Sequence, residues 1–233
     1  MSPQAREKIL SAVELALGFP KRDEEILKGK STGEVHWLNP SAPWDSVEKE
    51  LSVLSARFHR IEDTGQLRDL LGSIVEEYGV RSALMWDHPS LEKLKVAQFL
   101  DERGVRRVDT SDPEKFRIEA AKADMGITAA EALIEESGAI VVRSSREMPR
   151  AVSLLPPVHV AIVSWAQRIS TIWDVVPLWR SWLEKEGRLP SAVHFITGPS
   201  RTADIELTLV LGAHGPKALH VVALPEELIS LRE

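Results

Sequence analysis

The chain of 233 residues contains no cysteine. Without thiolates it can form no disulfide framework, no thiolate zinc site, no cysteine-ligated iron–sulfur cluster and no cysteine nucleophile. Redox chemistry would therefore require a bound cofactor or a partner protein. The seven histidines show no i, i+4 helical pair of the zinc-protease type, so we expect no metal site.

Long apolar runs and nucleotide-binding signatures are also missing. No run approaches the roughly 20 apolar residues of a membrane span, and the segment MSPQAREKIL has no signal-peptide core, so we expect a cytoplasmic location. The net charge of −6 disfavours nonspecific binding to nucleic acid. The sequence holds no GxGxxG, GxxxxGK[ST] or GxSxG pattern, so dinucleotide, nucleoside-triphosphate and hydrolase functions lack their usual support.

What is present is a hydrophobic content of 43%, which suffices for one large domain. A helix is expected from Asp45, with Glu48 as a capping-box signal and an apolar series that extends to Ile61, and another over residues 66–78. After residue 80, short apolar runs alternate with helical patterns. The expected strands are 82–86, 105–108, 123–128, 139–142, 158–163, 192–196 and 219–224, and the expected helices are 91–100, 112–122, 129–136 and one capped by Asp174.

This alternation predicts an α/β domain over residues 45–233, with a mostly parallel sheet and helices on both faces. Residues 1–44 are interpreted as a helical N-terminal extension followed by a loop, which Trp37 and Trp44 are expected to pin to the body. The helix after Asp174 is expected to turn four apolar side chains inward, namely Leu178, Trp179, Trp182 and Leu183.

The most polar turn, TGPSRTADIE over residues 197–206, follows an expected strand. Ligand sites of α/β proteins gather at the carboxyl ends of parallel strands, so we place a candidate small-anion site here. A guanidinium suits a carboxylate or phosphate, and capped backbone N–H groups suit an anion. The alternative is a capped turn whose arginine is neutralised internally. The candidate ligand-binding residues are Gly198, Ser200, Arg201, Thr202, Asp204 and Glu206.

Other candidate residues lie outside this turn. Thr128 ends an expected strand with a hydroxyl, and His214 lies in a glycine-containing loop. Glu136, at the end of the expected helix 129–136, is a candidate general base or nucleophile, or else part of an exposed carboxylate pair with Glu135. Three arginines after the strand 139–142 form either a phosphate-binding group or a solvated loop, namely Arg143, Arg146 and Arg150.

Three blocks of the sequence resemble the lactate utilization protein C family and its LUD domain. They are ADMGITAAEALIEESGAIVV (123–142), LLPPVHVAIV (154–163) and TGPSRTADIELTLVLGAHGPKALHVVAL (197–224). The last is the most specific, because GPSRTADIE, LVLGAHGP and LHV follow one another in this order and spacing. The resemblance covers residues 50–224.

The resemblance implies a fold similar to the sugar-phosphate isomerase and CoA-transferase superfamily. It also implies a role in bacterial oxidation of L-lactate to pyruvate with two partner proteins, at least one of which carries iron–sulfur clusters. The missing cysteines agree with a subunit that has no cluster of its own. Glu136-Ser137-Gly138 lies at a place similar to that of the nucleophilic glutamate in the CoA transferases, where the turn carries Asn-Gly.

Three functions stay open on this basis. The chain is a lactate-oxidation component that binds a small anion, a noncatalytic assembly subunit of that system, or a stand-alone CoA or sugar-phosphate transferase or isomerase. The residues do not decide whether the chain catalyses a reaction by itself, which ligand it binds, or how many copies assemble.

Overall fold

The computed structural model describes residues 34–109, 113–202, 210–212 and 215–229. The chain divides into two compact units, Met1–Glu34 and Val35–Glu233, and the described helices and strands all belong to the second. The helix expected near the N-terminus lies outside the described residues, and the division at residue 44 stays a prediction. No helix in the described ranges is long and apolar enough to cross a bilayer.

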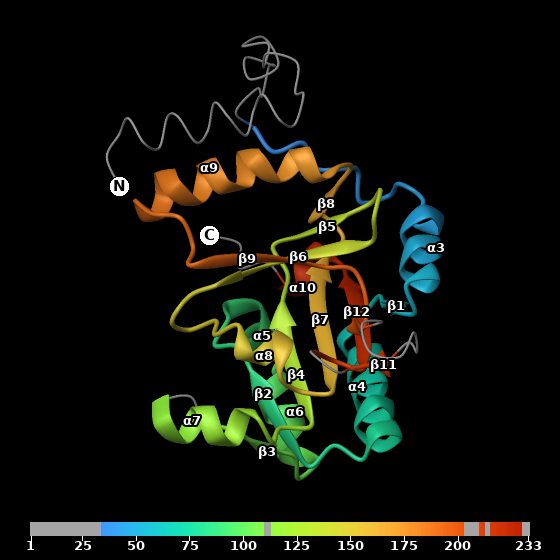
Figure 1. The fold of residues 1–233 in the computed structure, drawn as a ribbon. Coiled ribbons are helices and arrows are strands. Elements are labelled where there is room, and N and C mark those ends of the chain that lie inside the picture. The colour runs from blue at the N-terminus through green and yellow to red at the C-terminus, as the bar shows by residue number, and fades with distance from the viewer. Residues whose placement is uncertain (1–33, 110–112, 203–209, 213–214, 230–233) are drawn as a thin grey trace, which may run out of the picture. The chain divides into compact units, whose positions relative to one another are not determined.

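Six parallel strands form the main sheet, in the order β1-β12-β7-β4-β2-β3 (Figure 1). The two central strands β7 and β12 are almost entirely buried, which fits their continuous apolar sequences. The expected α/β fold with a mostly parallel sheet is thereby confirmed. The strands are β1 (Arg57–Arg60), β2 (Ser82–Met85), β3 (Arg106–Arg107), β4 (Met125–Ala129), β7 (Val158–Ser164) and β12 (Ala218–Leu224).

Helices cover both faces of this sheet. On one face, α8 (Ala151–Leu154) lies so close to β4 that a Cβ on Gly126 would meet the Val152 carbonyl oxygen at 1.8 Å. On the other face, Tyr78 of α4 contacts His220 of β12. The remaining helices of this region are α3 (Asp45–Val53), α4 (Thr64–Tyr78), α5 (Pro89–Lys93), α6 (Val96–Glu102), α7 (Pro113–Ala120) and α10 (Glu226–Ile229).

A second sheet of four strands, in the order β8-β5-β6-β9, was not expected from the sequence. Its strands are β5 (Ala132–Ile134), β6 (Ala139–Ser144), β8 (Arg168–Ile169) and β9 (Ala192–Ile196). The helix predicted over 129–136 is wrong, because residues 132–134 form the strand β5. These residues are completely buried, and burial outweighs the helix propensity of Ala and Leu. A short pair, β10 (Arg201–Thr202) and β11 (Val210–Leu211), completes the described strands.

The second sheet packs against α9 (Val175–Glu186), which follows the short 3-10 helix η1 (Ile172–Asp174) (Figure 1). Leu178 and Trp182 are buried there, as expected. The inward stripe was predicted too broadly, because Trp179 and Leu183 are 37% and 47% exposed. Asp174 accepts its hydrogen bonds from Thr171 rather than from α9, so the expected cap belongs to η1.

The helix predicted from Asp45 to Ile61 ends much earlier, at Val53. Ser55 adopts a left-handed conformation with φ 62°, and Ala56 N–H donates to the Leu51 carbonyl, which closes the helix. The apolar residue Phe58 then lies in β1. The apolar residues keep a helical spacing across this turn as far as Ile61, and this spacing led to the prediction of a longer helix. The predicted helix 91–100 is likewise divided into α5 and α6 at Lys95, where φ is 53°.

Candidate functional site

The polar turn after β9 does not lie at the carboxyl ends of the parallel strands. Ser200 N–H donates to the Pro216 carbonyl at 2.8 Å, two residues before β12 begins. Arg201 Nη2 donates to Ser55 Oγ at 2.7 Å, two residues before β1 begins. The described part of the turn therefore lies at the amino-terminal edge of the main sheet. The predicted placement is wrong because β9 runs antiparallel to β6 in the second sheet.

Only part of the predicted anion site is described. Gly198 lies where a Cβ would come within 2.7 Å of the Leu54 carbonyl oxygen, so the turn packs directly on the end of α3. Arg201 is exposed, and no described carboxylate pairs with it. Thr202 belongs to β10, and the structure does not describe its side chain. The candidates outside the described residues are Asp204, Glu206 and His214.

Glu136 lies in the turn of the β5–β6 hairpin, whose Gly138 has a φ of +63°. Its carboxylate is exposed and accepts a hydrogen bond from Ile172 N–H at 2.9 Å. The neighbouring Glu135 accepts from the Ser46 hydroxyl, at the start of α3.

The structure does not place Glu136 and Arg201 in one pocket. The hairpin turn contacts α3 at Ser46, whereas Arg201 contacts Ser55 just beyond the other end of that helix. At 1.5 Å per residue these two contacts are about 13 Å apart along the helix. Neither residue is among the described lining residues of the cavities of about 700, 410 and 250 Å³.

Thr128 is fully buried in β4, where its hydroxyl lies 2.9 Å from His159 Nε2 on β7. His159 is also fully buried, and burial lowers its pKa to about 3, so the imidazole is neutral. The structure thus provides Thr128 with an internal partner. Its predicted contact with a ligand stays untested.

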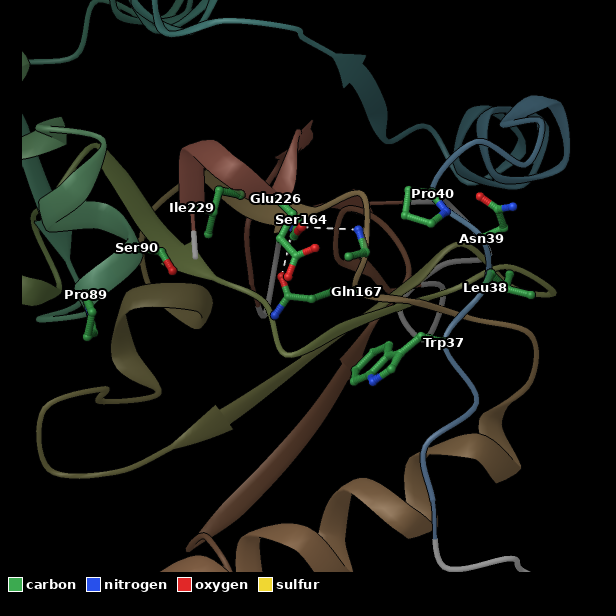
Figure 2. A pocket seen from close by; sticks show the side chains of 11 residues that line it. Trp37, Leu38, Asn39, Pro40, Pro89, Ser90, Ser164, Gln167, Glu226 and Ile229 are labelled. Atoms are coloured by element: carbon green, nitrogen blue, oxygen red, sulfur yellow. Dashed lines mark hydrogen bonds between the residues drawn. The ribbon is translucent and has the colours of Figure 1, made fainter. Parts of the chain in front are cut away.

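The carboxyl edge of the main sheet carries a cavity of about 700 Å³ (Figure 2). Ser164 ends β7, Pro89 follows β2 and Glu226 follows β12, so the cavity lies where parallel α/β sheets place ligands. A smaller cavity of about 410 Å³ lies at the ends of β2 and β3, beside Asp87 and Arg107. The described residues around the larger cavity are Trp37, Leu38, Asn39, Pro40, Pro89, Ser90, Ser164, Ala166, Gln167, Glu226 and Ile229.

Hydrogen bonds fix the polar floor of this larger cavity. Ser164 N–H donates to Gln167 Oε1 at 2.8 Å, and Ala166 N–H donates to Ser164 Oγ at 3.2 Å (Figure 2). Among the described lining residues, Glu226 alone carries a charge. No sequence motif indicates this cavity, because its lining residues come from separate segments between Trp37 and Ile229.

A buried arginine holds the loop that supplies one wall of the cavity. Arg168 is 0% exposed, and its guanidinium donates to the carbonyls of Ala42 and Pro43 at 3.0 Å each. The same group lies 4.2 Å from the centroid of the Trp44 ring and 3.3 Å from Glu135 Oε2. Trp44 is buried, as expected for a residue that pins the loop, whereas Trp37 is 43% exposed and faces the cavity.

Comparisons with known proteins agree on the family. The LUD domain model matches residues 45–224. Lactate utilization protein C of Shouchella clausii is 32% identical over 223 residues, which cover 93% of this chain and 96% of the relative. The protein of the same name from Halalkalibacterium halodurans is 30% identical over 224 residues, with 94% and 97% covered.

A solved structure confirms the fold. The crystal structure of a DUF162 family protein from Deinococcus radiodurans aligns with a TM-score of 0.51 at 21% identity, covering 80% of this chain and 99% of that one. The family match over residues 45–224 includes both sheets and the turn after β9, and it confirms the resemblance of the sequence blocks. The chain belongs to the LUD domain family.

Proposed function

We propose that this chain is a component of a bacterial lactate utilization system. The observation that carries the proposal is the likeness to lactate utilization protein C of Shouchella clausii, which extends over 96% of that relative. Likeness over nearly the whole length supports a shared role better than a likeness confined to one motif. The test is complementation: a strain without its own lactate utilization protein C should grow on L-lactate when it carries this chain, and failure of a stably expressed chain counts against the role.

The proposed reaction of the system is the oxidation of L-lactate to pyruvate in the cytoplasm, together with iron–sulfur partner proteins. The chain has no cysteine with which to hold a cluster, so electrons from lactate would pass to a partner. This subunit would then bind and orient a small anion, or it would assemble the partner proteins.

The proposed anion site is the turn 198–206, with Arg201 as the group that recognises the carboxylate. Its guanidinium is exposed, the bond to Ser55 Oγ engages one terminal nitrogen, and no described carboxylate neutralises it. A planar guanidinium can hold a carboxylate through two parallel hydrogen bonds, which fixes the orientation of a 2-hydroxy acid. Arg201→Gln should abolish growth on lactate with little loss of thermal stability. The matched control is Arg180→Gln, an exposed arginine of α9.

An assembly role is the second candidate, and one surface favours it. Trp173 is 78% exposed, and the outer side of α9 continues the apolar surface with Val176 at 38%, Trp179 at 37% and Leu183 at 47%. Exposed aromatic side chains at helical spacing are typical of surfaces that bind another protein. We assign this surface to an iron–sulfur partner of the same system, since the proposed reaction requires one.

Co-purification separates the assembly role from the anion site. Trp173→Ser with Trp179→Ser should remove the iron–sulfur partners from the purified complex, while Ile118→Ser, a 55% exposed residue of α7, should keep them. Partners retained by the double variant would contradict the assigned surface. A stand-alone transferase or isomerase is the third candidate, and calorimetric titration with CoA and sugar phosphates tests it directly.

A further inference from the structure

A cavity of about 250 Å³ lies where β6 ends and where the chain leaves α9 toward β9. Three arginines and one glutamate are among its described lining residues, which gives 3 − 1 = +2. This lining is more positive than the linings of the cavities of about 700 and 410 Å³. Its lining consists of Arg143, Ser144, Ser145, Arg146, Glu186, Arg188, Leu189, Pro190 and Ser191.

Arg143 is the fixed member of this cluster. Its Nε donates to Glu131 at 2.6 Å, and its Nη1 pairs with Glu186. The guanidinium also lies 5.3 Å from the centroid of the Trp182 ring on α9. Two carboxylates and a ring therefore hold Arg143 in place and balance its charge.

Arg146 and Arg188 are not balanced in this way. Both are exposed, and within the described part of the chain neither forms a hydrogen bond or an ion pair. The nearby Glu147 accepts from Ser145 Oγ at 2.9 Å. Hydrogen bonds to its own backbone N–H and to Ser145 lower the pKa of Glu147, and the charges of Arg146 and Arg188 lower it further. Glu147 is thus ionised but does not line the cavity.

Serine hydroxyls complete the lining. Ser144 is 5% exposed, and its Oγ finds no hydrogen-bond partner among the described residues. A buried hydroxyl without a partner is uncommon in folded proteins, and a bound ligand or ion is one established explanation. Ser191 lies across from it and donates to the Ser144 carbonyl at 3.3 Å.

We propose that this cavity binds a phosphate group, carried by inorganic phosphate or by a phosphate monoester. Within the lining, Arg146 and Arg188 are the cations without a hydrogen-bonded carboxylate, and their positive charges favour an anion. Two guanidinium forks and the hydroxyls also offer more donors than the two oxygens of a carboxylate accept, and guanidinium is well suited to phosphate. The site is distinct from the lactate site proposed at Arg201.

Calorimetric titration of the full chain, at fixed ionic strength, tests the proposal with inorganic phosphate and with glycerol 3-phosphate. Saturable binding is expected, and Arg146→Gln with Arg188→Gln should raise the dissociation constant at least about tenfold, equivalent to about 1.4 kcal/mol. Ser144→Ala should weaken binding without any change in charge. Tighter binding of one of the two probes identifies a free or an esterified phosphate, and either result supports the site.

Two control variants distinguish phosphate binding at this cavity from a general effect of charge and from anion binding at Arg201. Arg180→Gln removes one positive charge from α9 outside the cavity and should leave phosphate binding unchanged, as should Arg201→Gln. No saturable binding at millimolar phosphate, or an equal loss in Arg180→Gln, would overturn the phosphate site.

Arg188 also follows the carboxyl end of α9, where a cation stabilises the helix dipole. If that were its only role, Arg188→Gln would lower the melting temperature but leave phosphate binding intact.

Discussion

Arg201 Nη2 and Ser55 Oγ lie 2.7 Å apart, and this bond joins the turn after β9 to the residue that follows the C-cap of α3. Ser55 has a φ of 62°, a conformation that costs a residue with a Cβ roughly 1 kcal/mol relative to glycine. Glycine is the usual residue at such a helix end. The strained serine therefore contributes something that glycine lacks, namely a hydroxyl that orients Arg201.

Ser55→Gly separates stability from function at this contact. The substitution relieves the left-handed strain and should raise the free energy of unfolding by roughly 0.5 to 1 kcal/mol. It also removes the acceptor for Arg201, so growth on lactate should weaken if the orientation of the guanidinium matters. Ser55→Ala is the matched control, because it loses the hydroxyl and keeps the strain. Denaturant unfolding measures the free energy of unfolding. Normal growth on lactate of cells that carry the Ser55→Gly protein would show that the bond has no functional role.

Arg168 is predicted to hold the wall of the carboxyl-edge cavity. Arg168→Met removes two bonds to the Ala42 and Pro43 carbonyls and the contact with the Trp44 ring. We expect a loss of roughly 3 kcal/mol in the free energy of unfolding, since a buried charged group with several partners is removed. Urea titration gives the loss, and Arg180→Met on the exposed side of α9 should change stability by less than about 0.5 kcal/mol. Equal effects of the two variants would show that the loop is held in another way.

The adjacent residues Glu135 and Glu136 provide a paired test of the general-base or nucleophile role predicted for Glu136. Glu135→Gln weakens the partner of the buried Arg168 and should cost about 1 to 3 kcal/mol of stability. Glu136→Gln changes an exposed side chain whose bond to Ile172 N–H an amide oxygen can still accept, so the fold should be unaffected. Loss of lactate-dependent growth in Glu136→Gln at unchanged melting temperature would support a chemical role. Normal growth would contradict it.

Those parts of the fold that depend on local pattern could be predicted from the sequence. The continuous apolar runs of β7 and β12 predicted central parallel strands, and both are buried. By contrast, β5 was predicted as a helix, because Ala132 and Leu133 favour helices locally and only their burial between two sheets selects the strand. Patterns of apolar residues do not reveal which sheet a strand joins, so β9 was assigned to the wrong one.

The candidate site shows the same limit. The turn 198–206 is conspicuous in sequence because its polar residues are contiguous, but its position at the amino edge depends on the long-range pairing of Ser200 with Pro216. The carboxyl-edge cavity has no contiguous signal. Ser164, Gln167 and Glu226 become neighbours of one cavity only when β7 and β12 pair in register. Residues that directly follow strands were the signal that could have indicated it.

Buried histidines predict how stability depends on pH. Burial lowers the pKa of His159 to about 3, and burial, with His59 and Arg57 nearby, lowers the pKa of His220 to about 4. His220 also stacks on His59, with Nδ1 to Nε2 at 3.0 Å, and its Nε2 lies 3.3 Å from the Tyr78 hydroxyl. At pH 7.5 both histidines are almost entirely neutral in the folded and in the unfolded chain, because the ordinary pKa of histidine is about 6.5, so they add little pH dependence above that pH.

As the pH falls below 6.5, the unfolded chain takes up protons that the folded chain excludes, and stability falls until the folded pKa values are reached. Each histidine should cost roughly 1.4 kcal/mol at pH 5.5, a pH at which most carboxylates are still ionised in both states. Denaturant unfolding between pH 7.5 and 5.5 measures the slope. His159→Asn should reduce the stability loss between pH 7.5 and 5.5 by roughly 1.4 kcal/mol, whatever it does to stability at pH 7.5. A slope identical to that of the unsubstituted chain would show that His159 is protonated in the folded state.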